Sequence, residues 1–195
     1  MASPIKLNLK VYQGSTFRKV LRWESSTRTY VPITAIQKSA PVVVTAPNHG
    51  VPVGWRARVV GAGGMKEINS SEYSTVTSTT ADTVVFNEIN SLAYTAYTSG
   101  GVLEYNTPVN LSNYTARMQI RADVDSDVII HTLTTENSGI VFDNTLRTIT
   151  LNIPAAITAE FDFELAVYGL ELVYYNQDVI PFAGGNISLQ REVTR

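Results

Sequence analysis

Carboxylates are the side chains of this sequence that could do chemistry, and their spacing argues against it. Asp123, Asp125 and Asp127 alternate as in a calcium loop, but the glycine and the closing bidentate glutamate of an EF-hand are missing. Asp162 and Glu164 alternate on one face of a predicted strand, yet nothing else in the sequence supplies a nucleophile or a sugar site. The sequence predicts a solvated hairpin tip at the first set and surface or interface charges at the second.

The other reactive residue types are few. His49 lies in a polar turn, where a solvated ring is expected, and His131 lies in a predicted strand without an acidic cluster at ligand spacing. The chain has no cysteine, which removes disulfides, thiolate metal sites and cysteine nucleophiles. We therefore predict no catalytic residue, no metal, no cofactor and no enzymatic activity.

Two further motifs have a structural and a functional interpretation. The glycine-rich residues 61–64 follow a predicted strand, but neither a helix nor a Lys-Ser/Thr pair comes next, so a tight turn is expected rather than a phosphate loop. Trp55, Tyr94, Tyr97 and Tyr105 have flat rings that could stack on a sugar, although core packing and interface contacts are preferred. Seven residues are candidate interface positions: Trp55, Tyr94, Tyr97 and the tail residues Glu192, Val193, Thr194 and Arg195.

Composition excludes several classes of protein. The 195 residues carry a net charge of −2, so no basic excess exists to neutralise nucleic-acid phosphates. The chain starts with polar residues and has no apolar run near the roughly 18 residues of a membrane span. We expect a soluble protein that binds neither nucleic acid nor membrane. Its low charged fraction of 16% suits a surface that partners cover.

The elements that must position these residues are short strands. Thr, Val, Ile and Tyr dominate, and several segments alternate apolar and polar residues, which is the period of a half-buried strand. Strand spacing of roughly 8–12 residues is typical of a sandwich or barrel. A short helix is expected at residues 154–161. The clearest expected strands are 5–11, 17–23, 29–36, 55–60, 73–79, 114–121, 148–153, 163–175, 179–182 and 186–190.

The predicted fold is all-β: an antiparallel β-sandwich with an inserted small β-barrel module and one short helix. The sandwich is discontinuous and comprises residues 1–30 and 107–195, and the insert comprises residues 31–106. The tail after residue 191 is expected to be an extended strand or an ordered arm.

The insert carries one resemblance. Its sequence between Ile33 and Gly101, including residues 42–50, 54–59 and 61–69, resembles the module described as the first catalytic-cysteine half-domain of ubiquitin-activating enzymes. The resemblance implies a small β-barrel that recurs in phage tail proteins. It does not imply the enzyme's chemistry, because this chain has no cysteine.

The outer part carries a second resemblance. Residues 108–121, 134–140, 168–172 and 192–195 are similar to motifs of the N-terminal β-sandwich of upper baseplate proteins of tailed bacteriophages. Departures from that pattern lie at Asn110, Ser138 and Gly169, where the family has an acid, a glycine and an acid. The family is structural, so the resemblance implies assembly or fibre attachment.

Function and location are therefore expected as follows. The chain is a virion protein of the tail, collar or baseplate, assembled in the host cytoplasm. Its partners are other virion proteins of the tail, adaptor or fibre, and it is present as a homo-oligomer or in several symmetric copies. Two alternatives stay open: a head-decoration or head-closure protein, and a glycan-binding receptor-recognition module.

Overall fold

The predicted all-β class is confirmed. The computed structural model describes residues 4–192, in which strands make up 51% and helices 4% of the chain. The fold divides into two compact units, which we name by their place in the sequence. The terminal unit combines the described residues up to Arg22, Asn110–Asn144 and the chain from Thr148 onward. The inner unit combines Trp23–Val109 with Thr145–Arg147.

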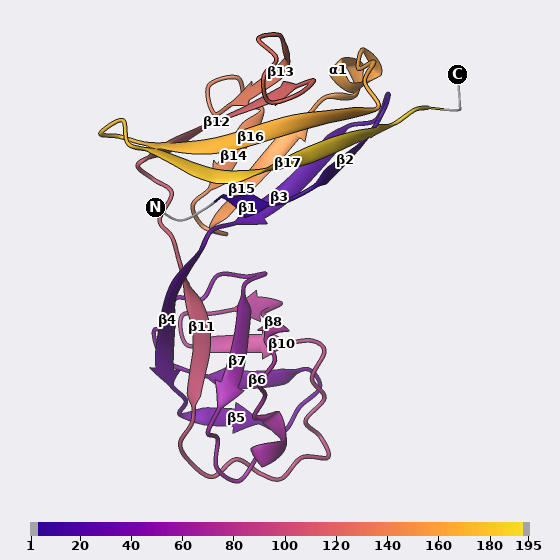
Figure 1. Cartoon of the computed structure of the whole chain (residues 1–195). Helices are drawn as coiled ribbons and strands as arrows, with labels where there is room; N and C mark the ends of the chain where they lie inside the picture. Colours follow the sequence, from indigo (N-terminus) through magenta and orange to yellow (C-terminus); the bar gives the residue numbers. More distant parts are fainter. Residues whose placement is uncertain (1–3, 193–195) are drawn as a thin grey trace. The chain divides into compact units, whose positions relative to one another are not determined.

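The terminal unit contains a six-stranded sheet. Its strands follow the order β1-β17-β16-β12-β13, and β2 also pairs with β17 (Figure 1). The pairs are antiparallel except that β1 and β2 run parallel to β17. The strands are β1 (Ile5–Lys6), β2 (Leu9–Tyr12), β12 (Tyr114–Arg121), β13 (Ile129–Thr134), β16 (Leu165–Tyr174) and β17 (Val179–Gln190).

A three-stranded antiparallel sheet completes the strands of this unit. Its order is β14-β15-β3, with β3 (Phe17–Arg22), β14 (Ile140–Asp143) and β15 (Thr148–Ile153). The predicted short helix is confirmed as α1 (Ala155–Ala159), directly after β15. Pro154 forms its N-cap with φ −60°, the angle that the proline ring fixes, so the residue starts the helix without strain.

Sequence alternation explains the buried face of the large sheet. In β12, Ala116, Met118 and Ile120 are buried, and the residues between them are more exposed. In β16, Leu170 and Leu172 are buried by the same period of two. The predicted long strand at 163–175 is therefore present as β16, an interior strand between β17 and β12.

The last strand differs from the prediction at its glycines. The sequence predicted two strands, 179–182 and 186–190, on either side of Gly184 and Gly185, but β17 is one strand that runs through both glycines. The link between β1 and β2 passes close to this point, because Leu7 N donates to Gly184 O (2.9 Å). A Cβ on Gly185 would lie 2.6 Å from Leu7 O, so a residue without a side chain is needed for this approach. The glycines therefore serve close backbone packing.

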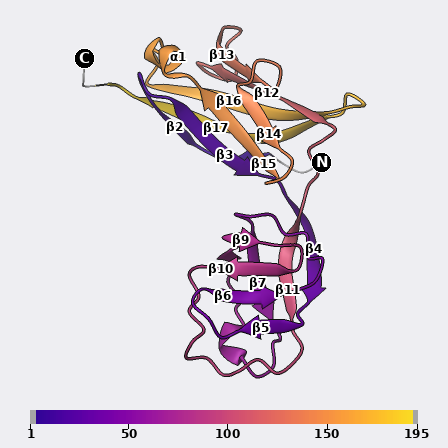
Figure 2. The same ribbon diagram turned by 180° about the vertical axis from the view of Figure 1, so that it is seen from behind.

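The inner unit contains two four-stranded sheets, with the orders β4-β11-β7-β8 and β5-β6-β10-β9 (Figure 2). The predicted strand at 29–36 is divided, because β4 ends at Pro32, and the one at 73–79 is divided between both sheets. The elements are β4 (Glu24–Pro32), β5 (Ala35–Gln37), β6 (Val42–Thr45), β7 (Arg56–Val60), η1 (Lys66–Ile68), β8 (Ser74–Thr75), β9 (Ser78–Thr79), β10 (Thr83–Phe86) and β11 (Val102–Pro108).

Each unit has its own arrangement of sheets. The expected insert, residues 31–106, lies inside the inner unit, which also includes residues 23–30. The sandwich and the barrel themselves stay predictions, as do the exact limits of the insert. No helix in residues 4–192 is long and apolar enough to cross a membrane.

Candidate functional site

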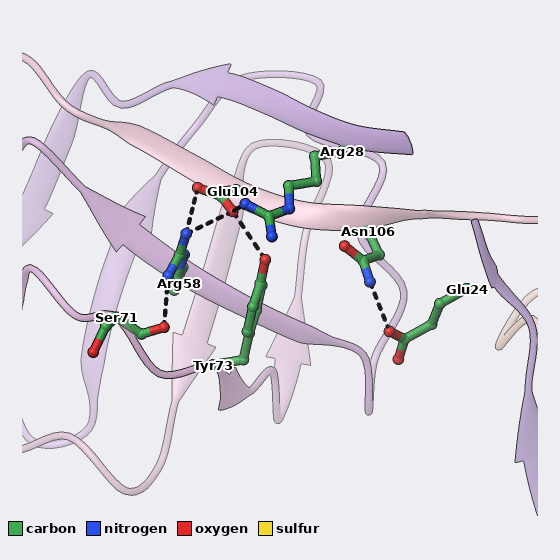
Figure 3. A network of polar contacts seen from close by, with 7 residues as sticks. All are labelled: Glu24, Arg28, Arg58, Ser71, Tyr73, Glu104 and Asn106. Carbon is green, nitrogen blue, oxygen red and sulfur yellow. Dashed lines mark hydrogen bonds and ion pairs between the residues drawn. The ribbon is translucent and has the colours of Figure 1, made fainter. Parts of the chain in front are cut away.

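Glu104 is the most deeply buried carboxylate of the inner unit, and strand register assembles its surroundings. It lies in β11, which pairs with β4 on one side and β7 on the other. Arg58 of β7 is its register partner, and Arg28 of β4 lies opposite Asn106, two residues further along β11. Since residues two apart in a strand share a face, both arginines reach the carboxylate (Figure 3).

Three donors occupy the Glu104 carboxylate. Arg58 Nη2 donates to both oxygens, at 2.9 and 3.0 Å, and the Tyr73 hydroxyl donates to Oε1 at 2.9 Å. Arg28 Nη1 lies 3.0 Å from the same oxygen. The Arg58 guanidinium also lies over the Tyr73 ring, 5.0 Å from its centroid, and donates to Ser71 O. The cluster joins three strands to the 71–73 loop.

The electrostatics of this cluster keep Glu104 ionised. Burial raises the pKa of its carboxyl. The hydrogen bonds from Arg58 and Tyr73 and the nearby positive charges lower this pKa by more than burial raises it, so the pKa lies below its ordinary value. Burial and the bond to Glu104 raise the pKa of the Tyr73 hydroxyl. At neutral pH the carboxylate is charged and engaged with these donors, so the arrangement suits structural support better than proton transfer.

Trp55 lies in the core of the inner unit. Its ring has no exposed surface, and Nε1 donates to Asn106 O at 2.8 Å. A ring in this position cannot stack on an external sugar or contact a partner, so we do not propose an interface role for Trp55. Tyr105 is also buried, and its hydroxyl donates to His49 O.

The prediction of a solvated His49 is wrong. The ring is buried, its Nδ1 accepts from Val51 N at 3.0 Å, and Nε2 lies 3.1 Å from Thr83 O. With Nδ1 as acceptor, the proton is on Nε2, which donates to the carbonyl. The histidine therefore ties its turn to β10.

Tyr94 and Tyr97 are partly buried and pack against the same core. The Tyr97 hydroxyl lies within hydrogen-bond distance of Ile33 O (3.0 Å) and Gly100 O (2.9 Å). Each ring keeps some exposed surface, so an interface role stays a prediction for these two. The structure does not place them beside an exposed Trp55, because Trp55 is buried.

The acidic residues singled out in the sequence lie at the surface of the terminal unit. Asp123, Asp125 and Asp127 are exposed in the loop between β12 and β13. Asp162 and Glu164 precede β16, which begins at Leu165, so their predicted position within a strand is wrong. Within residues 4–192 no group of three or more His, Asp or Glu side chains is placed to hold a metal ion.

His131 lies in β13, with its ring centroid 5.9 Å from that of Phe161. Burial lowers its pKa, which favours the neutral ring at pH 7. Glu192 is exposed at the end of the described chain, and its N–H points to Gln13 Oε1 at 3.4 Å. The other predicted tail contacts, Val193, Thr194 and Arg195, lie outside the described residues.

Two surface hollows of the terminal unit were not expected from the sequence. One, of about 420 Å³, lies on the outer face of the large sheet and is lined by residues of β12 and β16 and by Asp123 and Val124. Two of its arginines are engaged, because Arg117 Nε donates to Glu171 Oε2 at 2.8 Å and Arg121 donates to Gln119 Oε1 and Ser126 O.

The second hollow, of about 430 Å³, lies between β2 and β3. We call it the β2/β3 groove; its lining residues are Asn8, Leu9, Lys10, Tyr12, Ser15, Thr16, Phe17, Arg18 and Lys19. The sequence signal that could have found it is a charge bias, since residues 4–22 contain five Lys and Arg and no Asp or Glu. A net charge of −2 for the whole chain conceals this basic segment.

Comparison of the sequence with protein-family models and with curated proteins gave no match. The two resemblances described above therefore stay predictions.

Proposed function

We propose that the chain is a non-enzymatic structural protein of a tailed-phage virion. In this proposal it belongs to the tail, collar or baseplate, docks on the tail and helps to attach fibres or neighbouring virion proteins. The proposal has two supports: the kind of surface that the terminal unit offers, and the resemblance of its motifs to upper baseplate proteins.

The observation that carries the proposal is a set of end strands with exposed aliphatic side chains. β13 ends the large sheet, and β14 and β3 are the two ends of the small sheet. Ile129 of β13 is 42% exposed, Val141 of β14 is 48% exposed and Val20 of β3 is 49% exposed. An end strand offers backbone groups to an added strand, and apolar side chains beside it strengthen the contact. Such edges suit permanent assembly with other proteins.

The phage assignment depends on the motif residues themselves. The segment 114–121 of the baseplate-like motif is the whole of β12, and its apolar residues Ala116, Met118 and Ile120 form part of the buried face. These three motif residues therefore pack in the core, which agrees with a structural role for the motif.

Cryo-electron microscopy of particles of the encoding phage, together with mass spectrometry of their proteins, tests this proposal. Density of the terminal unit at the tail, collar or baseplate, touching a fibre or adaptor, is the expected result. Density on the capsid lattice or at the head opening would replace it with the decoration or closure alternative. Absence of the chain from purified particles would overturn the structural role.

A further inference from the structure

The β2/β3 groove carries unpaired positive charge. Lys10, Arg18 and Lys19 line it and are exposed, and no acidic residue is among its lining residues. Among the described residues none of these three cations has an ion pair, and Lys10 instead lies 4.9 Å from the centroid of the Tyr12 ring. The Glu192 carboxylate lies beside Gly14, at the turn after β2, and is not among the lining residues of the groove.

Backbone geometry leaves the same groove open to a ligand. β2 pairs only with β17, and β3 pairs only with β15, as far as the described strands extend. The two strands lie side by side in both views (Figures 1 and 2) but belong to different sheets. Tyr12 and Phe17 add aromatic surface to the lining. The groove thus combines three cations, apolar surface and two strand edges.

The loop between β12 and β13 has the complementary chemistry. Asp123, Asp125 and Asp127 are exposed, and none of them forms an ion pair with any described residue. Val124 and Val128 between and beside them are 83% and 71% exposed, the two highest values among the exposed large hydrophobic residues of the described chain. We call residues 123–128 the acidic tip. Of its residues, Asp123 and Val124 line the other hollow of the terminal unit, and none lines the β2/β3 groove of its own chain.

We propose that the β2/β3 groove is a docking site for the acidic tip of a second copy of this chain. Three carboxylates of the tip would face Lys10, Arg18 and Lys19, and Val124 would enter the apolar part of the groove. Both surfaces belong to the terminal unit, so the contact requires no particular placement of the inner unit. The proposal goes beyond the proposed function, and it holds or fails whether or not the chain is a phage protein.

The two surfaces are different, so the contact is heterologous. After one contact, one copy still has a free groove and the other still has a free tip. Repetition of the contact therefore gives a ring or an open filament. The charges are exposed, so attraction should depend strongly on ionic strength. These two properties separate the proposed contact from a symmetric dimer and from association driven by apolar surface alone.

The test is self-association of the full chain, measured by analytical ultracentrifugation over a range of concentrations at 50 and 500 mM NaCl. We expect association at low salt and a dissociation constant that rises at least about tenfold at high salt. A chain that stays monomeric at every concentration and at both salt concentrations overturns the proposal.

Charge reversal then identifies the surfaces. One variant carries Lys10→Glu, Arg18→Glu and Lys19→Glu, and the other carries Asp123→Lys, Asp125→Lys and Asp127→Lys. Each variant alone should be monomeric, because one half of every contact is repelled. An equimolar mixture should associate again, with the two variants alternating. The acidic tip of the first variant fits the basic groove of the second, and the basic tip of the second variant fits the acidic groove of the first.

Controls separate docking from folding. Lys38→Glu with Lys66→Glu, two exposed positions of the inner unit, reverses charge elsewhere and should leave association unchanged. Far-UV circular dichroism checks that each variant is folded. A chain that carries both sets of reversals should associate again, because the two surfaces are complementary once more. Association that persists in both single-surface variants, or a mixture that stays monomeric, overturns the assignment of these surfaces.

Discussion

Glu104 and Arg58 are register partners on the neighbouring strands β11 and β7. They form an ion pair in which Arg58 Nη2 donates to both carboxylate oxygens of Glu104, at 2.9 and 3.0 Å. The pair is largely shielded from water. Removal of one charge would leave the other buried without a partner, which costs more free energy than the loss of an exposed ion pair.

We expect Glu104→Gln to destabilise the inner unit by about 2 kcal/mol. The neutral amide keeps one acceptor but leaves the charges of Arg58 and Arg28 uncompensated. Arg28 is half exposed and can turn to water, which keeps the cost below that of a fully buried triad. Both tryptophans of the chain lie in the inner unit, so tryptophan fluorescence during urea unfolding reports on this unit. The matched control is Glu72→Gln, at an exposed position, which should change stability little.

The contribution of Glu104 should disappear in acid. Its pKa in the folded state lies below the ordinary value of 4.5, so the unfolded chain binds the proton more tightly. The stabilisation is therefore complete above pH 4.5 and is lost as the pH falls through the folded-state pKa. The measurable quantity is the difference in unfolding free energy between the wild type and Glu104→Gln, which cancels most contributions of other carboxylates. It should be constant from about pH 7 to 5 and shrink towards pH 3; a difference that does not shrink contradicts the assignment.

Trp55→Phe should destabilise the inner unit by about 2–3 kcal/mol. The smaller ring leaves a cavity in the core, and Asn106 O loses the indole N–H that lies 2.8 Å away. Trp23 remains as the fluorescent reporter in the same unit. Tyr94→Phe is the control, because that ring is only partly buried. Equal stability of the two variants would contradict a core role for Trp55.

Local pattern predicted much of this fold because strand alternation is a local property. Residues 114–121 alternate in sequence, and they form the predicted strand as β12, with the apolar Ala116, Met118 and Ile120 buried. The Glu104 cluster was missed because its members come from segments far apart in sequence, which only strand pairing brings together. The one feature of the sequence that could have indicated a buried carboxylate is the position of Glu104 among the apolar residues Val102, Leu103 and Tyr105. Trp55 was singled out by residue type, which says nothing about whether a ring faces the core or a partner.

Gly185→Ala should destabilise the terminal unit by about 1–3 kcal/mol. A Cβ at this position would lie 2.6 Å from Leu7 O and 2.9 Å from Asn8 Oδ1, so the β1–β2 link would have to move away from β17. Gly169→Ala on the neighbouring strand β16 is the matched control, because a Cβ there has no other atom within 4 Å.

Differential scanning calorimetry follows both units, and tryptophan fluorescence identifies the transition of the inner unit. The other transition should fall in temperature for Gly185→Ala and not for Gly169→Ala. Equal shifts in the two variants would contradict a special requirement for glycine at position 185, where the close approach of Leu7 O and the φ of +157° both disfavour a side chain.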